Sequence, residues 1–129
     1  MLHREQVDKI TAFAKARPVI SAIYLFGSHA SGRERPKSDI DLGVVFRRDV
    51  DGFERINMET EISNLLNKEV HLVDMRKSSP FLRHQIYKYG AWLYDDDSDY
   101  PVTFMAKSIS YYLDTEPLRK LRRTSLYGE

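Results

Sequence analysis

The chain has 129 residues, a length typical of one domain, of which 42% are hydrophobic and 30% are charged. Its 20 Lys and Arg residues and 19 Asp and Glu residues leave a formal net charge of +1, so bulk charge does not indicate nucleic-acid binding. The absence of cysteine excludes disulfide bonds and thiolate zinc sites and is compatible with a reducing cytoplasm. The charged N-terminus lacks the apolar core of a secretory signal, and no run reaches transmembrane length. We therefore expect one domain over residues 1–129, located in the cytoplasm.

The first predicted elements are a helix, a strand and a tight turn. Residues 4–16 place apolar side chains on one stripe at helical spacing, namely Val7, Ile10, Phe13 and Ala14. Pro18 ends this helix, and the apolar run from Val19 to Phe26 predicts a strand. The run stops at Gly27-Ser28, where we expect Ser28 to be the N-cap of a short helix, His29-Ala30-Ser31.

A second strand is predicted from the run that opens at Asp39 and ends at Phe46. Because successive strand side chains point to opposite faces, Asp39 and Asp41 share one face with Gly43 and Val45. The other face takes Ile40, Leu42, Val44 and Phe46. Two carboxylates that are two residues apart along a strand are separated by roughly 7 Å, so both can converge on one divalent cation or on a close pair. Burying two like charges without a cation would be costly.

The Gly27-Ser28 turn supplies features that suit a nucleotide. Gly27 allows a phosphate to approach the main chain, and the N-terminus of the following helix presents N–H groups and a positive dipole end. The loop that follows is basic, and its Arg33, Arg35 and Lys37 have two interpretations, phosphate contact or a solvated loop. Ser38, directly before the acid pair, either hydrogen-bonds a phosphate or ties the loop.

The pattern of Gly27-Ser28, ten residues and then Asp39-x-Asp41 resembles the nucleotidyltransferase motif of the DNA polymerase β-like superfamily. In its short length the chain is similar to the minimal nucleotidyltransferase (MNT) branch, whose members are often antitoxins encoded beside a HEPN-domain ribonuclease. The resemblance implies an α/β (α+β) polymerase β-like fold, a small mixed sheet flanked by helices. It also implies that Asp39 and Asp41 are catalytic and bind Mg²⁺, and that Gly27, Ser28 and Ser38 bind the nucleotide.

The same resemblance implies an expected activity, and two alternative functions stand beside it. The expected activity is Mg²⁺-dependent transfer of AMP from ATP to a tyrosine hydroxyl of a cognate HEPN toxin, which neutralises the toxin. A catalytically weak or inactive antitoxin that binds and occludes the toxin is the alternative. A third possibility is modification of a small hydroxylated molecule, but relatives with that activity usually carry an additional domain for the substrate. Neither a membrane nor direct nucleic-acid binding is expected.

The third predicted strand, Glu69 to Asp74, departs from the family pattern. Members of the superfamily often carry a third acid near the middle of this strand, and the matching residue here is His71. Imidazole is a metal ligand, but Mg²⁺ prefers oxygen. Glu69 has the right strand parity but lies two residues earlier, whereas Asp74 belongs to the opposite face. The residue that serves the third position is therefore left open between His71, Glu69 and Asp74.

Two further helices are predicted on either side of the third strand. The first runs from about Phe53 to Asn67, with a core face formed by Phe53, Ile56, Ile62, Leu65 and Leu66. The second is capped by Ser78-Ser79-Pro80, runs from Phe81 to about Tyr89 and ends at Gly90. Its expected inward residues are Phe81, Leu82 and Ile86, and its expected outward residues are Arg83, His84 and Lys88.

The C-terminal part is predicted to contain a strand, an acidic loop, a helix and a basic arm. Ala91 to Tyr94 form the strand, and the acids between residues 95 and 99 form a solvated loop, because they lack the glycine and the terminal glutamate of an EF-hand. A helix follows from near Pro101 through Leu113. The basic arm from about residue 115 has three interpretations: a frayed terminus, an arm that docks a partner, or an RNA-contacting patch.

Overall fold

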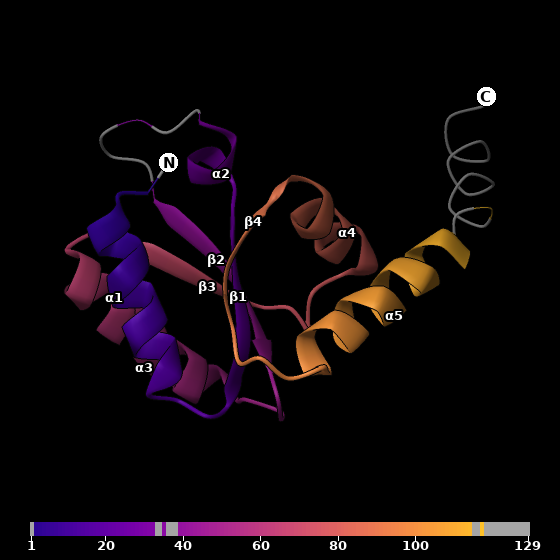
Figure 1. Cartoon of the computed structure of the whole chain (residues 1–129), viewed down its shortest axis with the longest axis horizontal. Helices are drawn as coiled ribbons and strands as arrows, with labels where there is room; N and C mark the ends of the chain where they lie inside the picture. Colours follow the sequence, from indigo (N-terminus) through magenta and orange to yellow (C-terminus); the bar gives the residue numbers. More distant parts are fainter. Residues whose placement is uncertain (1, 33–34, 36–38, 115–116, 118–129) are drawn as a thin grey trace.

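A four-stranded mixed sheet lies at the centre of the molecule, with the strand order β3-β2-β1-β4 (Figure 1). The computed structural model describes residues 2–32, 35, 39–114 and 117. Its strands are β1 (Ile20–Phe26), β2 (Ile40–Phe46), β3 (Val70–Asp74) and β4 (Ala91–Asp95). Strand β1 is antiparallel to both β2 and β4, whereas β3 is parallel to β2. The predicted mixed sheet is thus confirmed.

Helices cover both faces of this sheet (Figure 1). They are α1 (Arg4–Lys15), α2 (Ser28–Ser31), α3 (Gly52–Leu66), α4 (Pro80–Tyr89) and α5 (Tyr100–Asp114). Helices α1 and α3 lie on one side, α4 and α5 lie on the other, and α2 follows the end of β1. Helix α3 is the crossover that a parallel connection between β2 and β3 requires. Within the described residues, none of these helices combines the length and the apolarity needed to cross a membrane.

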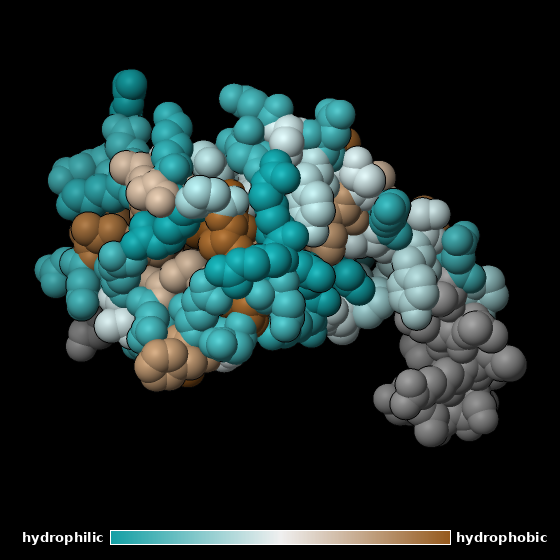
Figure 2. Space-filling view, turned by 90° about the horizontal axis from the view of Figure 1, so that it is seen from below, coloured by the Kyte–Doolittle hydropathy of each residue, from teal (hydrophilic) through white to brown (hydrophobic). Residues whose placement is uncertain are grey.

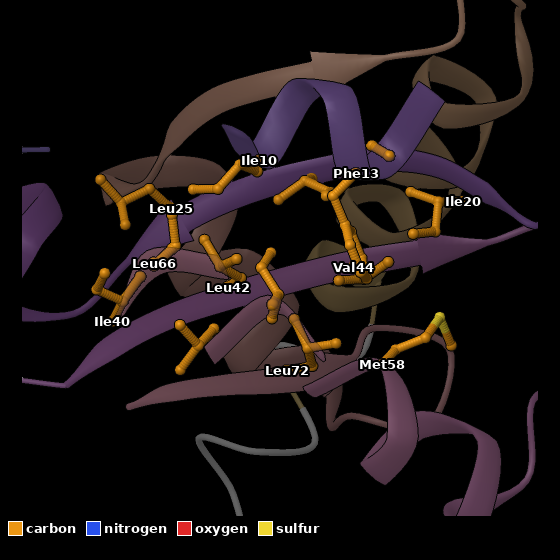
Figure 3. Packing of buried hydrophobic residues seen from close by; sticks show 14 of the residues in the cluster. Ile10, Phe13, Ile20, Leu25, Ile40, Leu42, Val44, Met58, Leu66 and Leu72 are labelled. Atoms are coloured by element: carbon orange, nitrogen blue, oxygen red, sulfur yellow. The ribbon is translucent and has the colours of Figure 1, made fainter. Parts of the chain in front are cut away.

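The larger core fills the space between the sheet, α1 and α3 (Figure 3). As predicted, β2 contributes alternate residues to it, namely Ile40, Leu42, Val44 and Phe46, all with no solvent exposure. Helix α1 adds Ile10 and Phe13, and α3 adds Met58, Ile62 and Leu66. The alternation of residue types along β2 therefore fixes which way Asp41 points, whereas Asp39 lies just before the observed strand, which begins at Ile40 rather than at Asp39 as predicted.

A second, smaller core packs α4 and α5 against the opposite face of the sheet. It contains Ala22, Tyr24, Val45, Met75, Ile86 and Met105. The C-terminal end of α4 comes very close to β1 at Gly90: a Cβ there would lie 2.5 Å from the carbonyl oxygen of Ile86 and 2.8 Å from that of Leu25. Only glycine fits this position, so α4 is held against the sheet on the same face as Asp41.

The predicted core face of α3 is wrong in part. Phe53, Ile56 and Leu65 are 76%, 50% and 46% exposed, whereas Met58, which was not predicted, is buried. The reason is that α3 turns a polar stripe toward the outer edge of β3. Ser63 accepts a hydrogen bond from the Val70 amide at 3.0 Å, Glu59 accepts one from the Leu72 amide at 2.8 Å, and Arg55 donates to the Leu72 carbonyl at 3.1 Å. These side chains satisfy an edge strand that would otherwise present unpaired backbone groups.

Helix α4 also differs from its prediction, although Ser79 caps it as expected by accepting from the Leu82 amide. Phe81 is 57% exposed rather than inward. His84 and Arg83, predicted to face outward, instead face α5: His84 stacks on Tyr112 with ring centroids 4.3 Å apart, and the Arg83 guanidinium lies 5.8 Å from the ring centre of Phe104. On the face seen in Figure 2, apolar areas appear as separate patches between hydrophilic side chains.

The acidic loop after β4 is anchored rather than fully solvated. Arg47, directly after β2, donates to the Asp96 carboxylate at 2.7 Å and to the Ser98 hydroxyl at 2.6 Å. Partial burial raises the pKa of Asp96, but the hydrogen bonds from Ser98 and Arg47 outweigh that effect and lower the pKa to about 2. The predicted basic arm from about residue 115 falls almost entirely outside the described residues, and the assignment of residues 1–129 to one domain stays a prediction.

We predict that Asp96→Asn lowers the free energy of unfolding at pH 7 by about 2 kcal/mol, the size of a charge-assisted hydrogen-bond pair. Because the pKa of Asp96 is lowered in the folded state, its contribution is complete above the ordinary value of 3.8 and disappears as the pH falls toward 2. Urea unfolding at several pH values measures this difference. Asp97→Asn removes the same charge from the same loop at an exposed position and should change stability by less than about 0.5 kcal/mol. Equal effects of the two variants would contradict the assignment.

Candidate active site

Asp41 occupies the middle of a row of three residues across the central strands. In the register of the sheet, Asp41 on β2 pairs with Phe26 on β1 and with His71 on β3. Cross-strand partners project to the same face, so all three side chains lie on the face covered by α4. The row stands where β1 ends and β2 and β3 begin, beside the turn into α2.

The turn after β1 packs directly against the Asp41 carboxylate. Gly27 has φ 76° and ψ −151°, a conformation that L side chains rarely adopt, and a Cβ on it would lie only 2.5 Å from Oδ2 of Asp41. The predicted N-cap is shifted by one residue: Gly27 is the N-cap of α2, and Ser28 is the first helical residue. The reason is that the backbone of Gly27, not a serine hydroxyl, makes the change of direction. The contact brings Gly27 and Asp41, two of the predicted site residues, together.

The third position of the site contains both His71 and Glu69. Nε2 of His71 lies 3.0 Å from Oδ2 of Asp39 and 3.8 Å from Oε1 of Glu69. One ligand atom from each of Asp39, Glu69 and His71 falls within 4.8 Å of the other two. Asp74 is only 7% exposed, lies on the opposite face as its parity predicted, and accepts from the Arg76 amide instead. The residues that remain candidates for the third position are therefore His71 and Glu69.

Burial and neighbouring charges shift the pKa values of both Asp41 and His71. Burial raises the pKa of Asp41, and the neighbouring charge of Asp39 raises it further, while His71 and His29 act in the opposite direction. The hydrogen bond to Asp39 raises the pKa of His71 and makes it a donor to that carboxylate. A divalent cation at this site would offset the effects that disfavour the charge of Asp41.

The residues present fit Mg²⁺ in their oxygens but not in their histidine. The carboxylates of Asp39 and Asp41 are ligands of the kind that Mg²⁺ prefers, and Glu69 offers a third oxygen beside Asp39. The imidazole of His71 is better suited to softer metals. The hydrogen bond between His71 and Asp39 fixes the orientation of that carboxylate.

The remaining predicted site residues have different outcomes. Ser38, Arg33 and Lys37 fall outside the described residues, and Arg35 is exposed. Sequence reasoning missed His29, which follows the Gly-Ser pair, is only 4% exposed and influences the pKa of Asp41. Only its position in the sequence could have indicated this. A histidine directly after the Gly27-Ser28 turn lies near the site that the turn helps to form.

Comparisons with known proteins show which family this chain resembles in sequence and fold. Residues 8–99 match the family described as polymerase beta, nucleotidyltransferase. The protein adenylyltransferase MntA of Shewanella oneidensis is 34% identical over 95 residues, which cover 74% of this chain and 68% of that protein. A crystal structure described as a toxin-antitoxin with AMP-PNP superposes with a TM-score of 0.81 at 29% identity, covering 93% of this chain and 97% of the other. A chain from the complex of the tri-AMPylated S. oneidensis HEPN toxin with its MNT antitoxin gives a TM-score of 0.78 at 26% identity, covering 97% and 98%.

The close approach of Gly27 to Asp41 can be tested with one glycine variant, and a second glycine near α2 provides the control. Gly27→Ala must place its Cβ into the Asp41 carboxylate, so we expect the affinity for divalent cations to fall at least about tenfold and the protein to lose about 2 kcal/mol of stability. Gly32→Ala, at the other end of α2, has a similar φ of 73° but open space around its Cβ. It should cost only about 1 kcal/mol of stability and leave cation affinity unchanged. Calorimetric titration and urea unfolding distinguish the two outcomes, and equal losses of affinity would refute the steric account.

Proposed function

This chain belongs to the polymerase beta nucleotidyltransferase family, and from that premise we propose that it is an antitoxin acting in the cytoplasm. It transfers AMP from ATP to a tyrosine hydroxyl of a cognate HEPN toxin and so neutralises that toxin. The observation that carries the proposal is the placement of the Asp41 carboxylate against the Gly27-Ser28 turn, with Asp39 and His71 beside it. Carboxylates that can hold a divalent cation, placed beside a glycine turn, form an arrangement suited to nucleotidyl transfer.

The residues divide into a phosphate end and an acid end. At the phosphate end, Gly27 keeps the turn free of a side chain and Ser28 starts α2, so backbone groups approach the triphosphate of ATP. At the acid end, Asp39 and Asp41 are the residues that hold Mg²⁺, and His71 orients Asp39. When bound there, Mg²⁺ neutralises charge on the triphosphate and on the departing pyrophosphate.

The transfer itself requires little covalent chemistry from this chain. The tyrosine hydroxyl of the toxin gives up its proton to water at the exposed acid end. Its oxygen bonds to the α-phosphorus of ATP, the bond from that phosphorus to the β-phosphate oxygen breaks, and pyrophosphate leaves. The site contributes chiefly by holding the triphosphate and the acceptor in line and by its fixed charges. Its open, partly exposed acid end suits an acceptor on another protein: the side chains of Asp39 and His71 are each 44% exposed.

The proposed partner is supported by what the structural relatives are. Two chains with TM-scores of 0.81 and 0.78 come from toxin-antitoxin complexes, one with AMP-PNP and one with a tri-AMPylated HEPN toxin. Both superpositions cover more than nine-tenths of this chain, so the likeness extends to α4 and α5 and not only to the motif.

A second candidate function, neutralisation by binding alone, is favoured by one observation. His71 stands at the third position and already bonds to Asp39, so the site has one acid fewer in that row than the family usually carries. The two functions differ in whether Asp39 and Asp41 are needed. An antitoxin that acts by binding neutralises the toxin without these carboxylates, whereas an antitoxin that acts as an enzyme requires them.

Intact mass spectrometry tests the proposed transfer. The protein, ATP, Mg²⁺ and the cognate HEPN toxin are incubated, and the toxin is expected to gain one or more AMP masses. Asp41→Asn should slow the gain by more than about 100-fold, because a metal ligand contributes several kcal/mol and each 1.4 kcal/mol is a factor of ten. His71→Asp should increase the rate in Mg²⁺ about tenfold by adding an oxygen ligand.

A control variant and a measurement in cells complete this test. Asp97→Asn removes an exposed acid outside the site and should leave the rate unchanged. An unmodified toxin that still forms a tight complex, together with full protection of cells by the Asp39→Asn, Asp41→Asn double variant, would replace the enzyme with the binding antitoxin.

A further inference from the structure

A small pocket adjoins the acid pair on the side of α4. It has a volume of about 220 Å³ and is lined by Phe26, Gly27, Gln85, Ile86 and Tyr89. The first two residues come from the end of β1 and the turn, and the other three come from the C-terminal half of α4. We call it the Phe26–Tyr89 pocket.

The position of this pocket connects it to the proposed site. Phe26 is the register partner of Asp41, and Gly27 forms part of the pocket wall while its Cα packs against the Asp41 carboxylate. Phosphates that bind at the backbone of the turn therefore lie next to the pocket, since Gly27 belongs to both. A molecule that is anchored by phosphates at Gly27 can extend its other end into the pocket without crossing the sheet.

The lining of the pocket is suited to a flat aromatic ring with a polar edge. Ile86 is buried and gives an apolar floor, while the rings of Phe26 and Tyr89 give aromatic surface. Tyr89 is 64% exposed, so its ring is accessible from solvent, and Lys88 stands beside it with Nζ 5.3 Å from the ring centre. Gln85 contributes an amide, which offers a donor and an acceptor together.

We propose that the Phe26–Tyr89 pocket binds the nucleobase of the substrate triphosphate and that Gln85 makes it select adenine. The proposal rests on the proposed nucleotidyl transfer and adds to it the determinant of base choice. Aromatic side chains stack on bases with a gain that is largely independent of sequence, and a glutamine amide pairs in two places with adenine. The pocket is preformed because the close contact at Gly90 fixes the end of α4 against β1.

Calorimetric titration with two probes separates the base from the phosphates. One probe is ATP and the other is inorganic tripolyphosphate, each with Mg²⁺ and the full chain. Tyr89→Ala should weaken ATP binding about tenfold, equivalent to about 1.4 kcal/mol, and leave tripolyphosphate binding unchanged. Tyr89→Phe keeps the ring and should keep the affinity of the wild type.

Tyr87→Ala is the matched control on the same helix. Tyr87 is 56% exposed and does not line the pocket, since residues two apart on a helix point in different directions. The Tyr87→Ala variant should bind ATP and tripolyphosphate with the affinities of the wild type. Urea unfolding of each variant checks that the fold is retained.

Base selectivity tests the part assigned to Gln85. The wild type should bind ATP at least about tenfold more tightly than GTP, as one bidentate base contact predicts, and Gln85→Leu should remove most of that preference. ATP binding that is indifferent to Tyr89→Ala, or that weakens equally with tripolyphosphate binding, overturns the pocket and leaves the proposed transfer standing. A wild type that binds neither probe overturns both.

Discussion

The site depends on one steric constraint: the carboxylate of Asp41 occupies the space that any side chain at residue 27 would fill. The antiparallel register of β1 and β2 places Phe26 opposite Asp41, so the chain must turn into α2 directly beside the acid. A glycine with positive φ is what allows that turn. With no side chain at residue 27, the Asp41 carboxylate lies directly against the backbone of the turn.

Much of this arrangement follows from the alternation of residue types along β2. Ile40, Leu42 and Val44 are buried in one core, so Asp41 must point to the other face. His71 is its partner on the neighbouring strand. The closeness of Glu69 to Asp39 was not deduced, because it depends on the register of a parallel pair. Ile40 pairs with Val70, so the residues before them, Asp39 and Glu69, become neighbours. The residue pattern within each strand does not reveal how β2 and β3 align with each other.

The helices were harder to orient than the strands. Helix α3 has apolar residues on more than one side, and periodicity alone selected Phe53 and Ile56, which are exposed. The helix is instead oriented by both Met58 in the core and the polar stripe that bonds to β3. Helix α4 was likewise assigned from hydrophobicity, and the packing of His84 on Tyr112 reversed part of that assignment. In both helices, a polar side chain with a distant partner prevailed over the local pattern.

The polar stripe of α3 also limits how this protein can associate with other chains. On the outer edge of β3, the amide and carbonyl of Val70 both bond to Ser63, and those of Leu72 bond to Glu59 and Arg55. A strand from another molecule would have to displace these side chains before it could add to that edge. Intermolecular strand addition at β3, a common route to domain swapping and fibrils, is thus blocked for as long as α3 stays in place. The crossover that brings His71 to the site also closes this edge to aggregation.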